Sequence, residues 1–483
     1  MNADHRLTIS RRAFLEASAG LALTALAPMW PALAADLREY RLVAGRGRVR
    51  LVDGDRPETD VWAYNGAVPG PEIRVKQGDR VRVAVENRLG EETTVHWHGV
   101  RVPNSMDGVP HLTQKPIAPG ESFVYEFDVP DAGTYWYHPH QRSFEQVGRG
   151  LYGALIVEER TPVEIDRDLT WVLSDWRLLN NAQMSDDFGN RMEMAMGGRV
   201  GNTVTVNGRL PDSVAVRAGE RVRLRVINTA NARIFALEFQ GHRSLVIALD
   251  GQPVEPHEPD GGRLVLGPGM RADVVIDMTN SPGQRFPVID SFYRDLAYKL
   301  LDLAYSDEAP IRSRPLDTPV QLTKNTMPKP DLASAERHIL ALGGGMMGQM
   351  MGGGMMGGGM MGGMMGGGMM GGMMGSGIWS INGVSAAEHV MTPLLTLQRG
   401  RSHILAVRND TAWHHPIHLH GHSFRVIARN GQPTRFKEWL DTVLIPRRES
   451  ADIAFVADNP GGWMIHCHVL EHQASGMMGV IRI

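Results

Sequence analysis

The sequence contains one cysteine among 483 residues, so no intrachain disulfide can form, and that thiol is either inert core or part of a chemical site. Aromatic residues make up only 6%, whereas glycine (55) and methionine (28) are abundant. The net charge is −3 and no long basic run occurs, which argues against a nucleic-acid partner. Beyond the N-terminal segment, no apolar run reaches the ~18 residues that a membrane-spanning helix needs.

The N-terminus has the pattern of a targeting segment. Arg11 and Arg12 form a twin-arginine pair, residues 21–30 are modestly apolar, and residues 32–34 make an A-x-A-like cleavage site. These three parts in this order predict a twin-arginine signal peptide over residues 1–34 and a mature protein in the periplasm. An amphipathic anchor helix is the alternative.

Three segments share one frame, in which an Asn-Gly pair precedes a strand-like pattern. They cover residues 78–87, 219–228 and, more weakly, 400–409. In the first two copies apolar and polar residues alternate, which predicts a strand with one buried face. Frequent short strands broken by Gly, Pro and Asn then predict an all-β chain of three tandem β-sandwiches.

The same repeat gives approximate domain boundaries. We expect domain 1 at residues 36–160, domain 2 at residues 161–318 and domain 3 at residues 319–483. The glycines that open the three copies are 141 and then 181 residues apart, and a Met/Gly insert at residues 343–377 accounts for 35 of the 40 extra residues. The chain is long enough for three domains of about 150 residues each.

Four His-x-His units lie at equivalent places in domains 1 and 3, and none lies at these places in domain 2. The units are His96-Trp97-His98, His138-Pro139-His140, His418-Leu419-His420 and His466-Cys467-His468. Residues i and i+2 of a strand face the same side, so each unit directs two imidazoles to one point. Eight imidazoles are too many for one metal ion and suit a cluster shared between two domains. Imidazole binds copper, zinc, iron and nickel alike, so these histidines alone do not name the metal.

The cysteine identifies the metal. Cys467 lies between two of these histidines, so its sulfur points to the opposite face of the strand. His415, Cys467, His472 and a weak axial Met477 make a His₂Cys set with a thioether, the blue-copper arrangement. Met478 is the alternative axial ligand. A copper-bound thiolate on one face, with cluster ligands on the other, forms a covalent electron route.

These motifs resemble the four copper motifs of multicopper oxidases, and the resemblance covers the whole chain after the signal peptide. Within that family the sequence is most similar to the bacterial periplasmic cuprous oxidases and copper-resistance oxidases, which have three cupredoxin-like Greek-key domains. The resemblance implies four copper ions, with O₂ as co-substrate. Four one-electron oxidations at a type 1 copper would supply electrons through Cys467, His466 and His468 to a trinuclear cluster that reduces O₂ to water.

The resemblance also implies a role for each candidate ligand. The type 1 copper would take His415, Cys467, His472 and Met477; the type 2 copper His96 and His418; and the type 3 pair His98, His138 and His468 on one ion and His140, His420 and His466 on the other.

Family members also carry acidic residues that donate protons to the trinuclear cluster. Asp107 matches the first of these acids, and a turn-forming Asp before Gly108 is the structural alternative. The place of a second acid, directly after His472, holds Gln473, which cannot titrate. Glu471 and a chain of water molecules are the two alternatives for this second proton donor.

The Met/Gly insert contains 14 methionines and 19 glycines, with Gln349 and Ser376 as the remaining residues. Thioethers favour Cu(I), and Met-rich inserts in domain 3 are a feature of the cuprous-oxidase branch. A flexible linker or an adaptable hydrophobic lid is the alternative. The candidate Cu(I) ligands are Met346, Met347, Met350, Met351, Met355, Met356, Met360, Met361, Met364, Met365, Met369, Met370, Met373 and Met374.

One departure weakens the assignment to this branch. Cuprous oxidases often place an Asp and a Met just before the first type 1 histidine, and the matching residues here are Thr411 and Trp413. We therefore expect Trp413 to pack over His415, with capture of a substrate ion depending on the insert.

The leading functional prediction is oxidation of Cu(I) to Cu(II) by O₂, in copper tolerance. A laccase-type oxidase of small phenols is the second hypothesis, and a copper store or carrier is the third. Nothing in the sequence requires more than a monomer. The remaining histidines, His338 and His403 among them, have no partner at ligand spacing, and we interpret them as surface or satisfied core residues.

Overall fold

The computed structural model describes residues 36–318, 320–346, 377–386 and 392–483. The predicted signal peptide and all insert methionines except Met346 lie outside these residues. The described strands belong to one compact unit, Leu37–Ile483. Within the described residues, no helix has the length and apolar character needed to cross a membrane.

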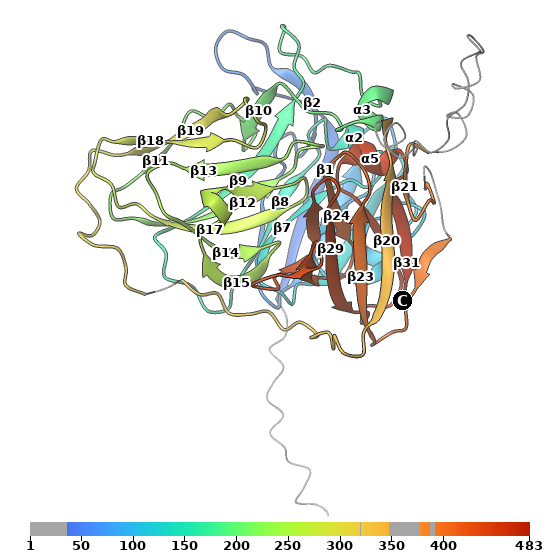
Figure 1. The fold of residues 1–483 in the computed structure, drawn as a ribbon. Helices are drawn as coiled ribbons and strands as arrows, with labels where there is room; N and C mark the ends of the chain where they lie inside the picture. The colour runs from blue at the N-terminus through green and yellow to red at the C-terminus, as the bar shows by residue number, and fades with distance from the viewer. Residues whose placement is uncertain (1–35, 319, 347–376, 387–391) are drawn as a thin grey trace, which may run out of the picture. The chain divides into compact units, whose positions relative to one another are not determined.

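The first group of strands forms two four-stranded sheets, in the orders β2-β1-β4-β6 and β3-β8-β7-β5 (Figure 1). A 3₁₀ turn at Asn104–Met106 lies in the connection from β5 to β6, between the two sheets, and the short helix α2 at Ser143–Gln146 lies between β7 and β8. The strands are β1 Leu37–Val49, β2 Thr59–Tyr64, β3 Ile73–Lys76, β4 Arg80–Asn87, β5 His96–His98, β6 Ser122–Asp128, β7 Gly133–His138 and β8 Gly153–Glu158.

The second group, green to yellow in Figure 1, forms a six-stranded sheet, β10-β9-β12-β17-β14-β15, and a five-stranded sheet, β11-β19-β18-β13-β16. Helix α3 covers Arg191–Ala195, and a second 3₁₀ turn covers Asp260–Gly262. The strands are β9 Arg167–Trp176, β10 Thr203–Val206, β11 Ser213–Val216, β12 Arg221–Asn228, β13 Phe235–Phe239, β14 Ser244–Leu249, β15 Gln252–His257, β16 Leu264–Leu266, β17 Arg271–Asp277, β18 Arg285–Asp290 and β19 Tyr298–Tyr305.

The third group, orange to red in Figure 1, forms one sheet in the order β21-β20-β23-β29-β25-β26, with β27 paired to β25, and a second in the order β22-β31-β30-β24-β28. Helix α5 covers Leu470–Ala474. The strands are β20 Glu336–Gly344, β21 Trp379–Ile381, β22 Pro393–Thr396, β23 Ser402–Asn409, β24 His415–Leu419, β25 Phe424–Arg429, β26 Gln432–Pro433, β27 Trp439–Leu440, β28 Thr442–Ile445, β29 Ser450–Val456, β30 Gly462–Cys467 and β31 Met478–Arg482.

The three repeat segments form equivalent strands. They are β4, β12 and β23, and each pairs in parallel with the first strand of its own group, β1, β9 or β20. This equivalence and the paired sheets confirm the prediction of an all-β chain with three tandem cupredoxin-like sandwiches.

Strand β12 departs from the predicted pattern because both of its faces are buried. Its arginines Arg223 and Arg225 are each only 1% exposed. The carboxylate of Asp273 on β17 lies 2.6 Å from Arg223 and 3.3 Å from Arg225, and it accepts a hydrogen bond from the Thr134 hydroxyl on β7 at 2.6 Å. The face that alternation predicts to meet solvent therefore packs against the first sandwich, and ion pairs compensate its charges.

Asp273→Asn tests this buried network. Loss of the carboxylate leaves two buried guanidinium groups short of a counter-charge, which lowers the free energy of unfolding by about 3–5 kcal/mol. We expect a clearly lower urea midpoint, measured by tryptophan fluorescence. The control is Arg243→Gln, which removes an exposed ion pair with Glu258 and should leave the midpoint nearly unchanged. Equal midpoints for Asp273→Asn and the wild type would contradict the assignment.

Candidate metal centres

Two strand pairs carry the eight histidines of the His-x-His units. β5 pairs with β7, with His96 opposite His138, and β24 pairs with β30, with His418 opposite His466. His98 follows on β5, and the other three units end just beyond their strands. All eight side chains are buried, the most exposed being His140 at 5%. The structure therefore brings every predicted cluster histidine into one place between the first and third sandwiches.

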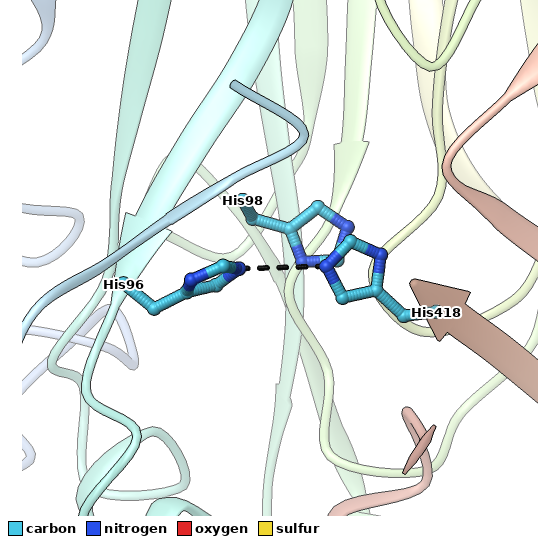
Figure 2. A group of neighbouring side chains, drawn as sticks. All are labelled: His96, His98 and His418. Carbon is cyan, nitrogen blue, oxygen red and sulfur yellow. Dashed lines mark hydrogen bonds between the residues drawn. The ribbon is translucent and has the colours of Figure 1, made fainter. Parts of the chain in front are cut away.

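The histidines form three groups, the first two of which share His98, and in each group one ring nitrogen of every histidine lies within 4.8 Å of the others. Figure 2 shows the first group, with His96 and His98 from β5 and His418 from β24 directed toward one another. The Nε2 atoms of His96 and His418 are 3.4 Å apart. The other two groups are His98, His138 and His468, and His140, His420 and His466.

Five of these imidazoles are oriented through Nδ1, which donates a hydrogen bond to a nearby oxygen. A neutral imidazole that donates from Nδ1 keeps its lone pair on Nε2, where it can bind a metal. The acceptors are Asp107 O for His96 at 2.8 Å, Pro139 O for His138 at 2.9 Å, Asp441 O for His418 at 2.9 Å, Asp107 Oδ2 for His420 at 2.8 Å and Cys467 O for His466 at 2.9 Å.

This arrangement fits metal ions and is unfavourable without them. The Nε2 atom of His466 lies 3.1 Å from that of His420 and 3.4 Å from that of His140, so lone pairs face one another. Buried ring nitrogens of three further histidines, His98, His138 and His468, have no hydrogen-bond partner. Burial lowers the pKa of His466 and His420 well below the usual value, which keeps their rings neutral. Cations between these rings would accept one lone pair from each of them.

Asp107 borders this cluster and is fully buried. Its carboxylate accepts the proton of His420 Nδ1, and its second oxygen is 3.3 Å from Nδ1 of His96. Gly108 is needed beside it, because φ is +78° and a Cβ atom would lie 1.8 Å from the carbonyl oxygen of Val95. Asp107 therefore contacts histidines of two different groups.

The second sandwich also reaches this cluster, although it holds none of the eight histidines. Arg271 on β17 is fully buried and lies 2.6 Å from the carboxylate of Asp441. The same carboxylate is 3.1 Å from Nε2 of His98 and 3.4 Å from Nδ1 of His418. Burial opposes ionisation of Asp441, but the guanidinium of Arg271 holds the pKa of this carboxyl below its usual range. No His-x-His pattern points to this pair, and the sequence analysis missed both residues.

Arg271→Gln should loosen the cluster. Without the guanidinium, the Asp441 carboxylate is left buried and uncompensated beside His98 and His418, so we expect fewer coppers per chain while the blue band of the type 1 copper persists. Metal analysis and the visible spectrum measure the two quantities. Arg263→Gln, a half-exposed arginine of the same sandwich, is the control. Full copper content in Arg271→Gln would contradict a positioning role.

A separate group combines the sulfur and two further imidazoles. The Nδ1 atoms of His415 and His472 lie 3.4 and 3.6 Å from Cys467 Sγ and 3.1 Å from each other. Their Nε2 atoms point away, toward the Thr411 hydroxyl and the Met196 carbonyl, both at 2.7 Å. Burial raises the pKa of the Cys467 thiol, so a bound cation is what would stabilise the thiolate.

The two candidate axial methionines have different surroundings. Met477 is fully buried in the same hydrophobic cluster as Cys467, and its backbone bonds to both Cys467 N and His472 O. Met478 begins β31 and lines a cavity together with His140 and Gln473. Burial beside the sulfur favours Met477 as the axial residue.

Trp379 packs against this group, a contact that the sequence analysis missed. Its ring centroid lies 4.2 Å from that of His472 and 5.2 Å from that of His415. We expected Trp413 in this place, but the ring of Trp413 lies next to Gly197. Trp379 lies two residues after Gly377, the last residue of the insert, and β21 begins with it. The sequence therefore offered one indication of this contact, an aromatic residue close to the end of the Met/Gly segment.

Glu471 and Gln473 flank His472 on α5. Glu471 is buried and accepts a hydrogen bond from Asn231 of the second sandwich at 2.9 Å, and burial raises the pKa of its carboxyl to about 7. The Gln473 amide nitrogen is 3.5 Å from both ring nitrogens of His140. Gln473 is therefore the one that borders the histidine cluster.

Three family models match the chain, each described as multicopper oxidase. They cover residues 48–162, 167–301 and 367–483, which together exceed half of the sequence. The chain belongs to the multicopper oxidase family and is an oxygen-dependent oxidase. Enzymes of this family use four copper ions and O₂, and the histidine and cysteine groups described above suit that cofactor set.

Characterised relatives include bacterial copper proteins. Multicopper oxidase MmcO of Mycobacterium tuberculosis is 32% identical, covering 88% of this chain and 84% of its own length. Copper resistance protein A of Escherichia coli is 26% identical and covers 99% of both chains.

Solved structures agree with the fold over most of the chain. A multicopper oxidase from Pseudomonas parafulva has a TM-score of 0.78 at 37% identity and covers 92% of this chain and all of its own. A metallo-oxidase from Campylobacter jejuni has a TM-score of 0.75 at 28% identity, covering 92% and 91%. A laccase-like enzyme from Ochrobactrum sp., with activity toward lignin model compounds, has a TM-score of 0.74 at 27% identity, covering 93% and 99%.

Proposed function

We propose that this protein oxidises Cu(I) to Cu(II) with O₂, as a periplasmic enzyme of copper tolerance. Four Cu(I) ions each lose one electron, and O₂ takes up four electrons and four protons to give two water molecules. We choose Cu(I) as the substrate because of the position at which the Met/Gly insert leaves and rejoins the fold.

Both ends of the insert meet at Trp379. Gly344 pairs with Trp379 in the β20–β21 ladder, and the amide of Gly345 donates to the carbonyl of Ile378 at 3.1 Å. A Cβ atom on Gly345 would lie 2.4 Å from the Trp379 ring, which itself packs on His472 and His415. Met346, the described methionine of the insert, is 38% exposed. A chain rich in Cu(I)-binding thioethers is thus tethered beside the group proposed to accept electrons.

We propose the ligand sets that the motifs imply. The type 1 copper takes His415, Cys467, His472 and Met477; the type 2 copper His96 and His418; and the type 3 coppers His98, His138 and His468, and His140, His420 and His466. When bound, the coppers accept single electrons from the reductant and deliver four to O₂. The near approach of these donor atoms supports the sets.

The residues around the sites have separate tasks in this proposal. Cys467 links the two centres, because its sulfur lies in one group while its carbonyl accepts the Nδ1 proton of His466 in the other. Asp107 holds His420 and borders His96, a position from which a carboxyl can supply protons where O₂ is reduced. Gln473 replaces the second acid of related enzymes, so Asp107 carries more of this task.

The predicted organisation completes the proposal. We propose a twin-arginine signal peptide at residues 1–34 and domains at residues 36–160, 161–318 and 319–483. The relatives named for copper resistance and metallo-oxidase activity support copper as the substrate. The laccase-like relative supports small aromatic reductants as the second candidate.

Cys467→Ser tests the electron route. A serine oxygen cannot replace the thiolate, so the blue colour should vanish and turnover should fall below detection, while copper in the histidine cluster is retained. The visible spectrum, metal analysis and O₂ uptake report these three properties. Met478→Leu is the matched control, because Met478 lines the cavity beside His140 and does not belong to the buried cluster around Cys467, and the variant should stay blue and active. A blue, active Cys467→Ser protein would refute the route.

A variant of the Met/Gly insert tests whether Cu(I) or a phenol is the preferred substrate. We expect replacement of its 14 methionines by leucine to lower Cu(I) oxidation at least tenfold while phenol oxidation is unchanged, since length and apolar character are kept and only thioethers are lost. O₂ consumption with stabilised Cu(I) and then with a phenol measures both.

A variant that lacks residues 347–376 distinguishes two roles of the insert, binding of Cu(I) and exclusion of bulky substrates. It keeps the Gly344–Trp379 ladder and should favour bulky phenols if the insert restricts access to Trp379. Wild-type enzyme that oxidises phenols and leaves Cu(I) untouched would establish the laccase hypothesis instead.

A further inference from the structure

Two histidines at the start of neighbouring strands in the third sandwich lie apart from the proposed copper ligands. β20 and β23 run in parallel, with Glu336 opposite His403 and His338 two residues further along β20. The Nε2 atom of His338 is 3.2 Å from Nδ1 of His403. A carboxylate oxygen of Glu336 lies 3.8 Å from His338 Nε2, and another lies 3.7 Å from His403 Nδ1. Two imidazole nitrogens and one carboxylate therefore converge on one point.

Hydrogen bonding and burial prepare this pair for a cation. His403 is fully buried, and its Nε2 atom is 3.4 Å from the carbonyl oxygen of Gln398, so Nε2 donates and Nδ1 keeps its lone pair. The side chains of His338 and Glu336 are 13% and 67% exposed, so an ion can enter from solvent on that side. Without an ion, the two rings share a single hydrogen bond.

We infer that His338, His403 and Glu336 form a further metal site, for a divalent transition-metal ion such as Zn²⁺ or Cu²⁺. Nitrogen ligands at 2.0–2.1 Å from a tetrahedral Zn²⁺ are separated by about 3.3 Å, close to the spacing of the two rings. The Glu336 carboxylate already lies 3.7–3.8 Å from these nitrogens, its side chain is exposed and free to approach the ion, and water completes the shell. Two imidazoles and a carboxylate suit Zn²⁺ and bind Cu²⁺ more tightly still.

This site is remote from the catalytic centres. β23 runs from Ser402 to Asn409, and the side chain of Asn409 donates to the carbonyl of Trp413, in the loop before His415, and to that of Ile445, the partner of His415 in the β24–β28 ladder. His403 lies six residues before Asn409, which is about 20 Å along a strand. An ion here would join β20, the strand that leads into the insert, to β23 without contacting the four coppers.

Zn²⁺ titration tests the site in protein that carries four copper ions per chain and has been freed of any further copper, because a copper ion left at His338 and His403 would block zinc. Zn²⁺ is the probe because thioethers of the insert favour Cu(I), and because Zn²⁺ does not displace Cu²⁺ from nitrogen ligands. By calorimetry we expect the wild type to bind one equivalent more than His338→Gln, and Glu336→Gln to bind that equivalent at least tenfold more weakly. His257→Gln, which removes a histidine whose side chain bonds to the Glu255 carbonyl on its own strand and stacks on Phe436, is the control and should match the wild type.

A second readout guards against an indirect effect of the substitution. Zn²⁺ should raise the thermal midpoint of the wild type and of His257→Gln but not that of His338→Gln. A bound ion stabilises the folded state only when its site exists in the folded protein. The blue band and O₂ uptake should be the same in all variants. Equal zinc stoichiometry in the wild type and His338→Gln, or no zinc bound by the wild type, would overturn the site.

Discussion

The fold is organised around buried imidazoles whose lone pairs face one another. Ring nitrogens of His420, His466 and His140 approach to 3.1–3.4 Å in a place that solvent does not reach. Neutral rings in this arrangement repel, and protonated rings would repel more, so only cations bring the cluster to a low free energy. The first and third sandwiches must pack together to form the cluster, and its metal ions would in turn hold these sandwiches together.

The second sandwich supports both centres from outside. Arg271 holds Asp441 against His98 and His418, and the carbonyl of Met196 accepts the Nε2 proton of His472. Asn231 binds Glu471 on α5. A domain without candidate copper ligands thus sets the orientation of histidines in the other two. This accounts for the buried charge of Arg271, which a sandwich serving only as a spacer would not need.

Much of the fold and of the candidate copper sites could be predicted from the sequence, because period-two alternation and His-x-His spacing are local signals. The three repeat strands, the pooling of eight imidazoles and the Cys467 group follow from such signals. The residues that were missed depend on contacts between distant segments. Arg271 and Asp441 are 170 residues apart, and the pairing of His338 with His403 exists only because β20 and β23 are parallel neighbours. Alternation also failed for β12, where a neighbouring sandwich covers the polar face.

The proposed arrangement requires that O₂ accept four electrons before any product leaves. The most direct measurement is the number of Cu(I) ions oxidised per O₂ consumed by the copper-loaded protein, with hydrogen peroxide assayed in the same vessel. The account predicts four Cu(I) per O₂ and no peroxide, because the eight imidazoles would hold three coppers in one cluster, to which Cys467 would pass the electrons needed for full reduction to water. Two Cu(I) per O₂, with one peroxide released, would contradict a working trinuclear cluster.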